Sequence, residues 1–424
     1  MEGRPAPFLK GCCHWKGIRF SKFCIHQVKS AINVGGTPAH FFGGWCPRNL
    51  WRRLKSRQRI ISSLTKQQIY SWQRIIYFCH LNSFIHHMKN TTLFFFVASL
   101  FFLNACKKEA ELQKIQFQGE AQGTYYAITY FAADTLVTQN QVDSLLDDFD
   151  QSASLWVENS LLSRINKNDT EVRLDQHLID LFNQSRIISE ATDGAFDITV
   201  GPLVKVWGFW FKEPIKVDQH VVDSLLPLVD FKGISIENGR IVKSNPNMMF
   251  DFNAIAQGYS VDLTGGFLET KGINNYLVDI GGEVLGRGQK PDGNPWRVGI
   301  EKPSKDADSE RQLKATISLR NRAVCTSGNY RKYYEIDGVR YSHAINPKTG
   351  YPAKNTLLSA SVVADNAATA DGYGTAFMVM GFEKAKEFIE THTELEAYFI
   401  YSDTDGSLKT WMSKGLEGLI EEEK

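Results

Sequence analysis

An aspartate and a threonine lie four positions apart in the segment ADGYGT (370–375). If this segment is helical, the Asp371 carboxylate and the Thr375 hydroxyl point to the same side of the helix. Both groups are hard oxygen donors of the kind that bind Mg²⁺, a cation that keeps positions open for phosphate oxygens. Taken alone, such a pair is more often an exposed helix face or a helix-start cap, so both interpretations stay open.

Two further residues could take part in phosphate chemistry. Asp251 precedes the apolar helix start AIAQG (254–258), and a helix N-terminus offers free N–H groups to an anion. An aspartate in the first helical turn is the ordinary alternative. His343 follows a strand and precedes an Asn-Pro turn, a loop setting that favours function although a lone histidine is more often structural. The glycine-rich segment DIGGE (279–283) matches neither a dinucleotide-binding fingerprint nor a phosphate-binding loop and indicates a turn.

Helices and strands predicted from the hydrophobic pattern must position these residues. The predicted helices are Gln139–Phe149, Asp175–Ala191, Ala254–Lys271, Ala367–Met380 and Glu383–Thr391. The predicted strands begin near Gly119 and continue at Asn275–Leu285, Trp296–Ile300, Lys314–Leu319, Leu357–Val363 and Glu396–Tyr401, with hairpins at Ile234–Val242 and Tyr334–Tyr341. Because strands and helices alternate irregularly, the pattern favours an α+β fold, with mixed or antiparallel sheets and packed helices, over a doubly wound parallel sheet.

Charge divides the 424-residue chain into two unlike parts. Residues 1–87 carry 14 basic residues and one acidic residue, whereas the remainder carries 34 basic and 46 acidic residues. A basic segment could bind nucleic acid, but this one lacks aromatic residues interleaved with basic ones on one face and lacks a CxxC pair. We therefore expect no nucleic-acid partner. We interpret 1–87 as a non-native upstream extension from a misassigned start, with Met88 as the working start.

The segment that follows Met88 has the order of a secretory signal. A short basic start leads to the apolar run LFFFVASLFFL (93–103), whose 11 residues are too few to span a bilayer, for which about 20 are needed. The tetrapeptide LNAC (103–106) resembles the lipobox of bacterial lipoproteins, and an ordinary signal peptide that contains a cysteine is the alternative. We expect 88–105 to be a lipoprotein signal peptide, Cys106 to be lipidated, and 106–118 to be a tether before a domain at 119–424.

Nine segments of this domain, taken in order, resemble the FAD:protein FMN transferase family, also called the ApbE family. They are GEAQGTYY (119–126), SLLSRIN (160–166), TDGAFDITVGPLVKVWGF (192–209), DFNAIAQGYSVDL (251–263), LVDIGGEV (277–284), WRVGIEKP (296–303), AVCTSGNYRKYY (323–334), HAINPKTGYP (343–352) and ATADGYGTAFMVMG (368–381).

The resemblance implies an ApbE-like fold and a Mg²⁺-dependent reaction with FAD as substrate. The FMN moiety passes to a Ser/Thr hydroxyl of an exported flavoprotein subunit, and AMP is released. The implied acceptors are subunits of respiratory complexes, such as Na⁺-translocating NADH:quinone oxidoreductase or the Rnf type. With the lipobox, this implies a lipid-anchored protein on the periplasmic face of a membrane.

The resemblance also implies roles for individual residues. The metal site maps onto Asp371, Thr375 and the backbone carbonyl of Ala254, and His343 is the expected proton-transfer group. The residues expected to contact the flavin dinucleotide are Gln122, Trp156, Ala195, Phe196, Asp197, Asp251, Gln257 and Ala344.

Three positions depart from the family pattern. Gln257 stands where many members have Lys or Glu, Asn346 replaces the usual aspartate, and Gly374 replaces a further acidic ligand of some members. Two alternatives share the same site: an FAD pyrophosphatase that gives FMN and AMP, and a lipoprotein that binds FAD without chemistry.

Overall fold

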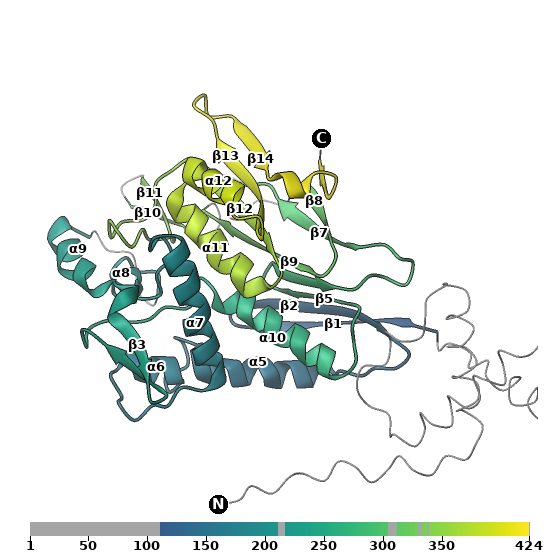
Figure 1. Cartoon of the computed structure of the whole chain (residues 1–424), viewed down its shortest axis with the longest axis horizontal. Helices are drawn as coiled ribbons and strands as arrows, with labels where there is room; N and C mark the ends of the chain where they lie inside the picture. Colours follow the sequence, from purple (N-terminus) through teal and green to yellow (C-terminus); the bar gives the residue numbers. More distant parts are fainter. Residues whose placement is uncertain (1–110, 211–216, 304–311, 330–332, 337–338, 424) are drawn as a thin grey trace, which may run out of the picture. The chain divides into compact units, whose positions relative to one another are not determined.

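An eight-stranded sheet positions the residues discussed above, in a computed structural model that describes residues 111–210, 217–303, 312–329, 333–336 and 339–423. The strand order is β1-β2-β5-β6-β9-β12-β13-β14, and each neighbouring pair is antiparallel (Figure 1). The strands are β1 Gln113–Ala121, β2 Thr124–Ala132, β5 Tyr276–Ile280, β6 Glu283–Arg287, β9 Arg322–Gly328, β12 Leu357–Ala364, β13 Glu396–Ser402 and β14 Leu408–Met412.

Smaller sheets and helices complete the described part of the chain. The other strands are β3 Ile234–Glu237 with β4 Arg240–Lys243, β7 Trp296–Glu301 with β8 Leu313–Leu319 and β15 Ile420–Glu422, and β10 Tyr333–Ile336 with β11 Val339–Ser342. The α-helices are α5 Gln139–Ala153, α6 Leu161–Asn166, α7 Gln176–Ala191, α8 Gly201–Val206, α9 Gln219–Leu225, α10 Ala256–Thr270, α11 Ala367–Met380 and α12 Phe382–Thr391. Short 3₁₀ turns are η2 Leu226–Leu228, η3 Phe231–Gly233 and η4 Lys414–Leu416. The expected α+β class is confirmed.

Alternating side chains allow the large sheet to bury both of its faces. The paired residues Leu285 and Ala323 belong to the core shared with α10 and α11, whereas their neighbours Val284 and Val324 belong to a second core with Trp296 of β7. This alternation is the period of two that a strand imposes on its side chains. The large sheet therefore separates a helical layer from the three-stranded sheet.

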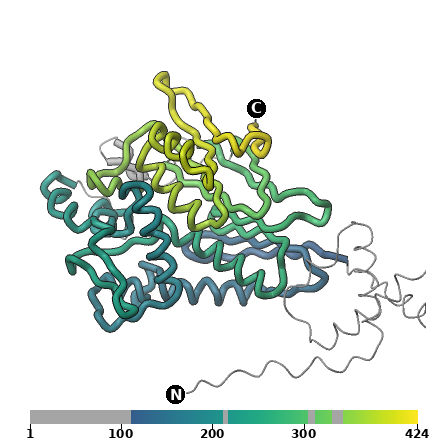
Figure 2. The backbone as a smooth tube through the Cα atoms, in the orientation of Figure 1, coloured from purple at the N-terminus to yellow at the C-terminus, as the bar shows by residue number. Residues whose placement is uncertain are grey.

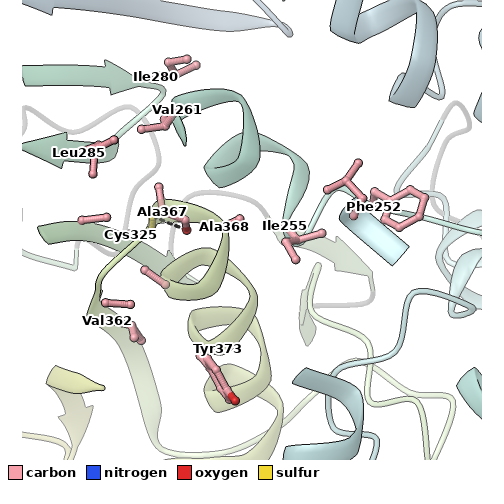
Figure 3. Close-up of a cluster of buried hydrophobic side chains, with 14 of the residues drawn as sticks. Phe252, Ile255, Val261, Ile280, Leu285, Cys325, Val362, Ala367, Ala368 and Tyr373 are labelled. Carbon is pink, nitrogen blue, oxygen red and sulfur yellow. Dashed lines mark hydrogen bonds between the residues drawn. The ribbon is translucent and has the colours of Figure 1, made fainter. Parts of the chain in front are cut away.

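Helices α10 and α11 lie side by side on the sheet although more than 90 residues separate them in sequence (Figures 1 and 2). Figure 3 shows Val261 of α10 and Ala367 and Ala368 of α11 above strands that carry Cys325 and Val362. Helix α11 begins where the Asn366 side chain accepts from the Thr369 N–H (2.8 Å). It is buried on nearly all sides, so a charged residue within it requires a specific reason.

The structure corrects several sequence-based expectations. Residues 113–118, expected in the tether, form most of β1, because alternate side chains there pack against the sheet. The single strand expected at Asn275–Leu285 is two strands, β5 and β6, since Gly281 and Gly282 both have positive φ (64° and 102°) and reverse the chain. Strands β9, β14 and β15 and helices α6, α8 and α9 were not predicted.

The predictions for 1–87, for 88–105 and for Cys106 lie outside the described residues. Within the described residues, every helix is too short or too polar to cross a membrane.

Candidate functional site

A cavity of about 480 Å³ gathers the predicted site residues from distant parts of the sequence. Its lining includes Gln122, Trp156, Ala195, Phe196, Asp197, Asp251, Ala254, Gln257, His343, Ala344 and Thr375. Asp371 is the one predicted site residue outside the lining, and it lies one helical turn before Thr375 on α11. The structure thus brings the predicted metal and flavin residues to one place.

Asp371 is a buried carboxylate that ties α11 to α10. It is 5% exposed, and its Oδ2 accepts a hydrogen bond from the backbone N–H of Gly258 (3.0 Å) in the first turn of α10. Asp262 ties the two helices in the reverse direction, from α10 to α11. Its two oxygens accept hydrogen bonds from the N–H groups of Ala367 and Ala368 (both 2.8 Å) at the start of α11. Each carboxylate thus neutralises the positive end of the neighbouring helix, and Asp371 is held in one orientation.

Thr375 faces the cavity and has a hydroxyl neighbour on the sheet. Its Oγ1 lies 3.4 Å from the Oγ of Ser327, in β9. Gly374 packs against the same serine, since a Cβ at position 374 would lie 2.9 Å from Ser327 Oγ. An acidic side chain at this position would therefore require Ser327 to move, which gives a physical account of the glycine.

Sequence reasoning missed Glu283, which stands close to Asp371. Its Oε2 accepts from the Thr326 N–H (3.1 Å), and burial together with the Asp371 carboxylate raises the pKa of Glu283 well above its usual value. The same carboxylates and, above all, burial raise the pKa of the Cys325 thiol, which donates to the Ala367 carbonyl (3.2 Å). The signal for Glu283 was its position directly after the Gly-Gly turn of the quoted LVDIGGEV segment.

Two amide side chains close the cavity near the β1–β2 turn. Gln122 adopts a positive φ of 56°, unusual for a residue other than glycine or asparagine, and its Oε1 accepts from the Ser260 hydroxyl (3.0 Å). Its Nε2 is buried and makes no hydrogen bond of ordinary geometry within the described residues. Gln257 donates through Nε2 to the Ile280 carbonyl (3.2 Å), so this amide is held without the charge that many family members carry there.

The two aspartates Asp197 and Asp251 also line the cavity. Oxygens of Asp197 accept from the Thr199 N–H (2.8 Å), the Thr199 hydroxyl (2.6 Å) and the Phe231 N–H (3.1 Å). Asp251 accepts from the Trp210 indole N–H (2.7 Å) and the Asn253 N–H (2.8 Å). Burial raises the pKa of both carboxyls, and their bonds indicate that they fix the surrounding backbone.

Backbone bonds hold the loop that carries His343 and Ala344. The Ala344 carbonyl accepts from the Ala353 N–H (2.8 Å), and Asn346 Oδ1 accepts from the N–H groups of Lys348 (2.9 Å) and Thr349 (3.2 Å). At the loop tip, the Gly350 carbonyl accepts from the indole N–H of Trp207 (2.8 Å). The loop therefore brings His343 to the cavity lining from a base that hydrogen bonds hold in place.

Trp156 lies at the mouth of the cavity. It is 58% exposed, so it is not the core tryptophan that was the alternative, and a tryptophan ring can stack on a flat ligand. The nearby Asp150 and Phe149 of α5 also line the cavity and were not predicted. The signal for Asp150 was an acidic residue directly after the predicted helix Gln139–Phe149, four positions after the apolar Leu146.

The oxygen donors present suit a divalent cation. Asp371 and Thr375 supply a carboxylate and a hydroxyl on one helix, and Ala254 lines the cavity together with Thr375. A second acidic side chain, Glu283, lies close enough to Asp371 for the Asp371 charge to raise its pKa. Within the described residues no group of three or more His, Cys, Asp and Glu side chains could hold a metal by itself.

Comparisons with known proteins show which protein family the chain resembles. The model of the ApbE family matches residues 122–399. The chain is 34% identical to the FAD:protein FMN transferase of Vibrio cholerae, over 75% of this chain and 98% of that protein. It is 33% identical to the Escherichia coli K12 protein of that name, over 77% and 96%.

Solved structures agree with these sequence relatives. The flavin transferase ApbE from Vibrio cholerae superposes with a TM-score of 0.65 at 32% identity, over 73% of this chain and 99% of that one. The apo flavinyl transferase ApbE of Pseudomonas stutzeri gives 0.65 at 30% identity, over 73% and 97%. Fold and site together define an enzyme of the flavin transferase class. The chain belongs to the ApbE family.

Proposed function

We propose that this protein transfers the FMN moiety of FAD to a serine or threonine hydroxyl of an exported flavoprotein subunit. The observation that carries the proposal is the single cavity that gathers the family's site residues from segments between Gln122 and Thr375. Relatives that this chain covers almost completely bear the name FAD:protein FMN transferase. The acceptors we propose are subunits of Na⁺-translocating NADH:quinone oxidoreductase or of Rnf-type complexes.

The chemical step is a substitution at phosphorus. The acceptor oxygen forms a bond to the FMN phosphorus, the bond from that phosphorus to the bridging oxygen breaks, and AMP leaves with the bridging oxygen. The hydroxyl proton passes to the His343 imidazole, because a neutral alcohol is a weak nucleophile and benefits from a base. Since FAD supplies its own leaving group, the reaction needs no ATP.

We assign the metal to Asp371, Thr375 and the Ala254 carbonyl. A Mg²⁺ ion bound there would offset the charge of the diphosphate and of the phosphorus substitution. The Asp371 carboxylate is already oriented by the Gly258 N–H, so little reorganisation is needed to present its other oxygen. Trp156 offers a flat ring for stacking. The carboxylates of Asp197 and Asp251 accept hydrogen bonds from neighbouring groups and so keep the cavity wall in place.

Labelling of an acceptor subunit tests this function. The protein is incubated with FAD, Mg²⁺ and a candidate acceptor, and flavin fluorescence is read in a denaturing gel. We expect a fluorescent acceptor band and AMP release. Free FMN and AMP without a labelled acceptor would indicate a pyrophosphatase, and unchanged bound FAD would indicate a binding lipoprotein.

Replacing Asp371, the proposed metal-binding carboxylate, tests the metal assignment. We expect Asp371→Ala to lose at least about 100-fold in Mg²⁺-dependent turnover while still binding FAD, because the lost group serves the reaction more than ring binding. Unchanged turnover would refute the metal assignment.

We further propose a lipid anchor at Cys106, which would hold the enzyme on the periplasmic face of a membrane. The support is the order of basic start, apolar run and LNAC in residues 88–106. Several acyl chains on one cysteine would anchor the protein stably, whereas a single chain is marginal. Mass spectrometry of the native lipoprotein tests this: a lipidated Cys106 at the N-terminus supports the anchor, and any peptide from residues 1–87 contradicts the start at Met88.

A further inference from the structure

Three aspartates line the cavity, and they differ in what their oxygens already bind. Asp197 and Asp251 accept hydrogen bonds from backbone N–H groups, from a threonine hydroxyl or from an indole N–H. Among the described residues, the Asp150 carboxyl has only a hydrogen bond from the Gln122 amide, which lowers its pKa. Asp150 can therefore accept further hydrogen bonds, whereas the oxygens of the other two aspartates already accept bonds from neighbouring protein groups.

The backbone of Asp150 is held in place by its neighbour in α5. Phe149 is 1% exposed, and its ring lies 5.3 Å from the ring of Tyr259 and 5.6 Å from that of His177. These contacts tie α5 to α10 and α7, because Tyr259 and His177 belong to those helices. The Asp150 carboxyl thus faces the cavity from a rigid element, the arrangement that makes a side chain selective.

Gln122 places an unsatisfied donor close to Asp150. Its Oε1 is held by Ser260, so the amide cannot turn freely, and its buried Nε2 makes no hydrogen bond of ordinary geometry within the described residues. A buried polar atom without a partner costs free energy, and Gln122 also keeps a left-handed backbone conformation at the turn. The Gln122 amide and the Asp150 carboxyl thus stand side by side in the wall, and the hydrogen bond between them lacks ordinary geometry.

Charge decides which part of a dinucleotide this pair can bind. Burial, and to a lesser degree Asp147, raises the pKa of Asp150, so a nearby phosphate would be repelled or would force the carboxyl to take up a proton. A neutral group with an N–H or O–H donor next to an acceptor atom matches both partners. Adenine, the flavin imide and vicinal sugar hydroxyls all present that pattern.

We propose that Asp150 is a specificity-determining residue, which accepts a hydrogen bond from a neutral N–H or O–H donor of the bound dinucleotide while Gln122 Nε2 donates to the atom beside it. The proposal rests on the proposed function, since it takes FAD as the ligand. It separates two tasks within one cavity: Asp371 and Thr375 serve the diphosphate, and Asp150 with Gln122 selects one of the two nucleotide halves.

Calorimetric titration of the full chain with FAD, FMN and ADP tests the proposal. The variant is Asp150→Asn, which keeps the size of the side chain but replaces one acceptor by a donor. The matched control is Asp148→Asn, an exposed aspartate of the same helix. We expect Asp150→Asn to weaken FAD binding at least about tenfold, the range of a lost charge-assisted hydrogen bond, and Asp148→Asn to stay within about twofold.

Binding of the two fragments, FMN and ADP, identifies which half of FAD the Asp150 side chain contacts. Selective weakening of ADP assigns the donor to the adenosine half, and selective weakening of FMN assigns it to the flavin half; either supports the proposal. FAD binding by Asp150→Asn within about twofold of the unchanged protein would overturn it, and so would equal weakening of both fragments with a lowered melting temperature. Failure of the unchanged protein to bind FAD would overturn the proposed function itself and this inference with it.

Discussion

Asn346 is the departure from the family pattern that the structure explains most directly. Its Oδ1 accepts from two successive N–H groups, those of Lys348 and Thr349, and a carboxylate oxygen could accept the same pair. The turn is further held by the Gly350 N–H, which donates to the Asn346 carbonyl (2.8 Å). The side chain therefore shapes the loop below His343, and the required property is an acceptor oxygen and not a charge.

The hydrogen bonds of the Asn346 side chain predict the effects of two substitutions at this position. We expect Asn346→Asp to keep turnover within about twofold, because it preserves the acceptor, and Asn346→Ala to lower kcat about tenfold by loosening the His343 loop. Flavin labelling rates of the two variants, with thermal unfolding as a check on folding, measure the effect. If Asn346→Ala labels its acceptor as fast as the unchanged protein, the loop needs no such support.

At the scale of elements, the site depends on how closely α10 and α11 approach. A Cβ at Gly258 would lie 2.4 Å from the Ala367 carbonyl oxygen and 2.7 Å from the Asp371 Cβ. Glycine is therefore required where the two helices cross, and the short separation lets the Gly258 N–H reach the Asp371 carboxylate. The glycine in the quoted AIAQG segment thus positions Asp371, the proposed metal ligand, through helix packing.

The close approach predicts the effect of adding one methyl group. We expect Gly258→Ala to lower the free energy of unfolding by about 1–3 kcal/mol, the usual cost of overpacking, and to weaken Mg²⁺ binding because Asp371 moves. The control is Gly266→Ala in the same helix, where a Cβ meets nothing within 4 Å and the substitution should be neutral or stabilising by up to about 1 kcal/mol. Urea unfolding of both variants decides, and equal stabilities would contradict the packing argument.

Asp262 gives the same pair of helices a pH dependence. Burial raises its pKa from 3.8 to about 6, against the opposing effect of the Ala367 and Ala368 N–H groups and of Arg287. Because the folded state binds this proton more tightly than the unfolded chain, the stabilisation is fully present below about pH 4 and is lost as pH rises through about 6.

Comparison with an amide isolates that contribution. We expect the stability advantage of the unchanged protein over Asp262→Asn to shrink by about 1–3 kcal/mol between pH 4 and pH 7, since only the carboxyl titrates. Urea unfolding across this range measures it, and every other titrating group is common to both proteins. An advantage that grows with pH, or stays constant, would show that folding does not raise the pKa of Asp262.

For the molecule as a whole, the sequence predicted those elements and residues that local residue spacing determines. Helices α5, α7, α10, α11 and α12 were predicted because their apolar residues recur at helical spacing, and the family segments located Asp371, Thr375 and His343. Strand β9 was missed because it is apolar on both faces and does not alternate. Asp150 and Glu283 were missed because their roles depend on which elements become neighbours, which no local period encodes.

The distribution of the site across the fold predicts a ligand effect on global stability. Because the cavity lining extends from β1–β2 to α11, FAD with Mg²⁺ should bind the folded state alone. A ligand at 100 times its Kd then stabilises by about 2.7 kcal/mol, or roughly 4 °C in melting temperature for a domain of about 300 residues. Circular dichroism melts with FAD, with FAD plus Mg²⁺, and with a chelator separate the two contributions. In Asp371→Asn we expect the FAD increment to persist and the Mg²⁺ increment to disappear, whereas an unchanged Mg²⁺ increment would place the cation elsewhere.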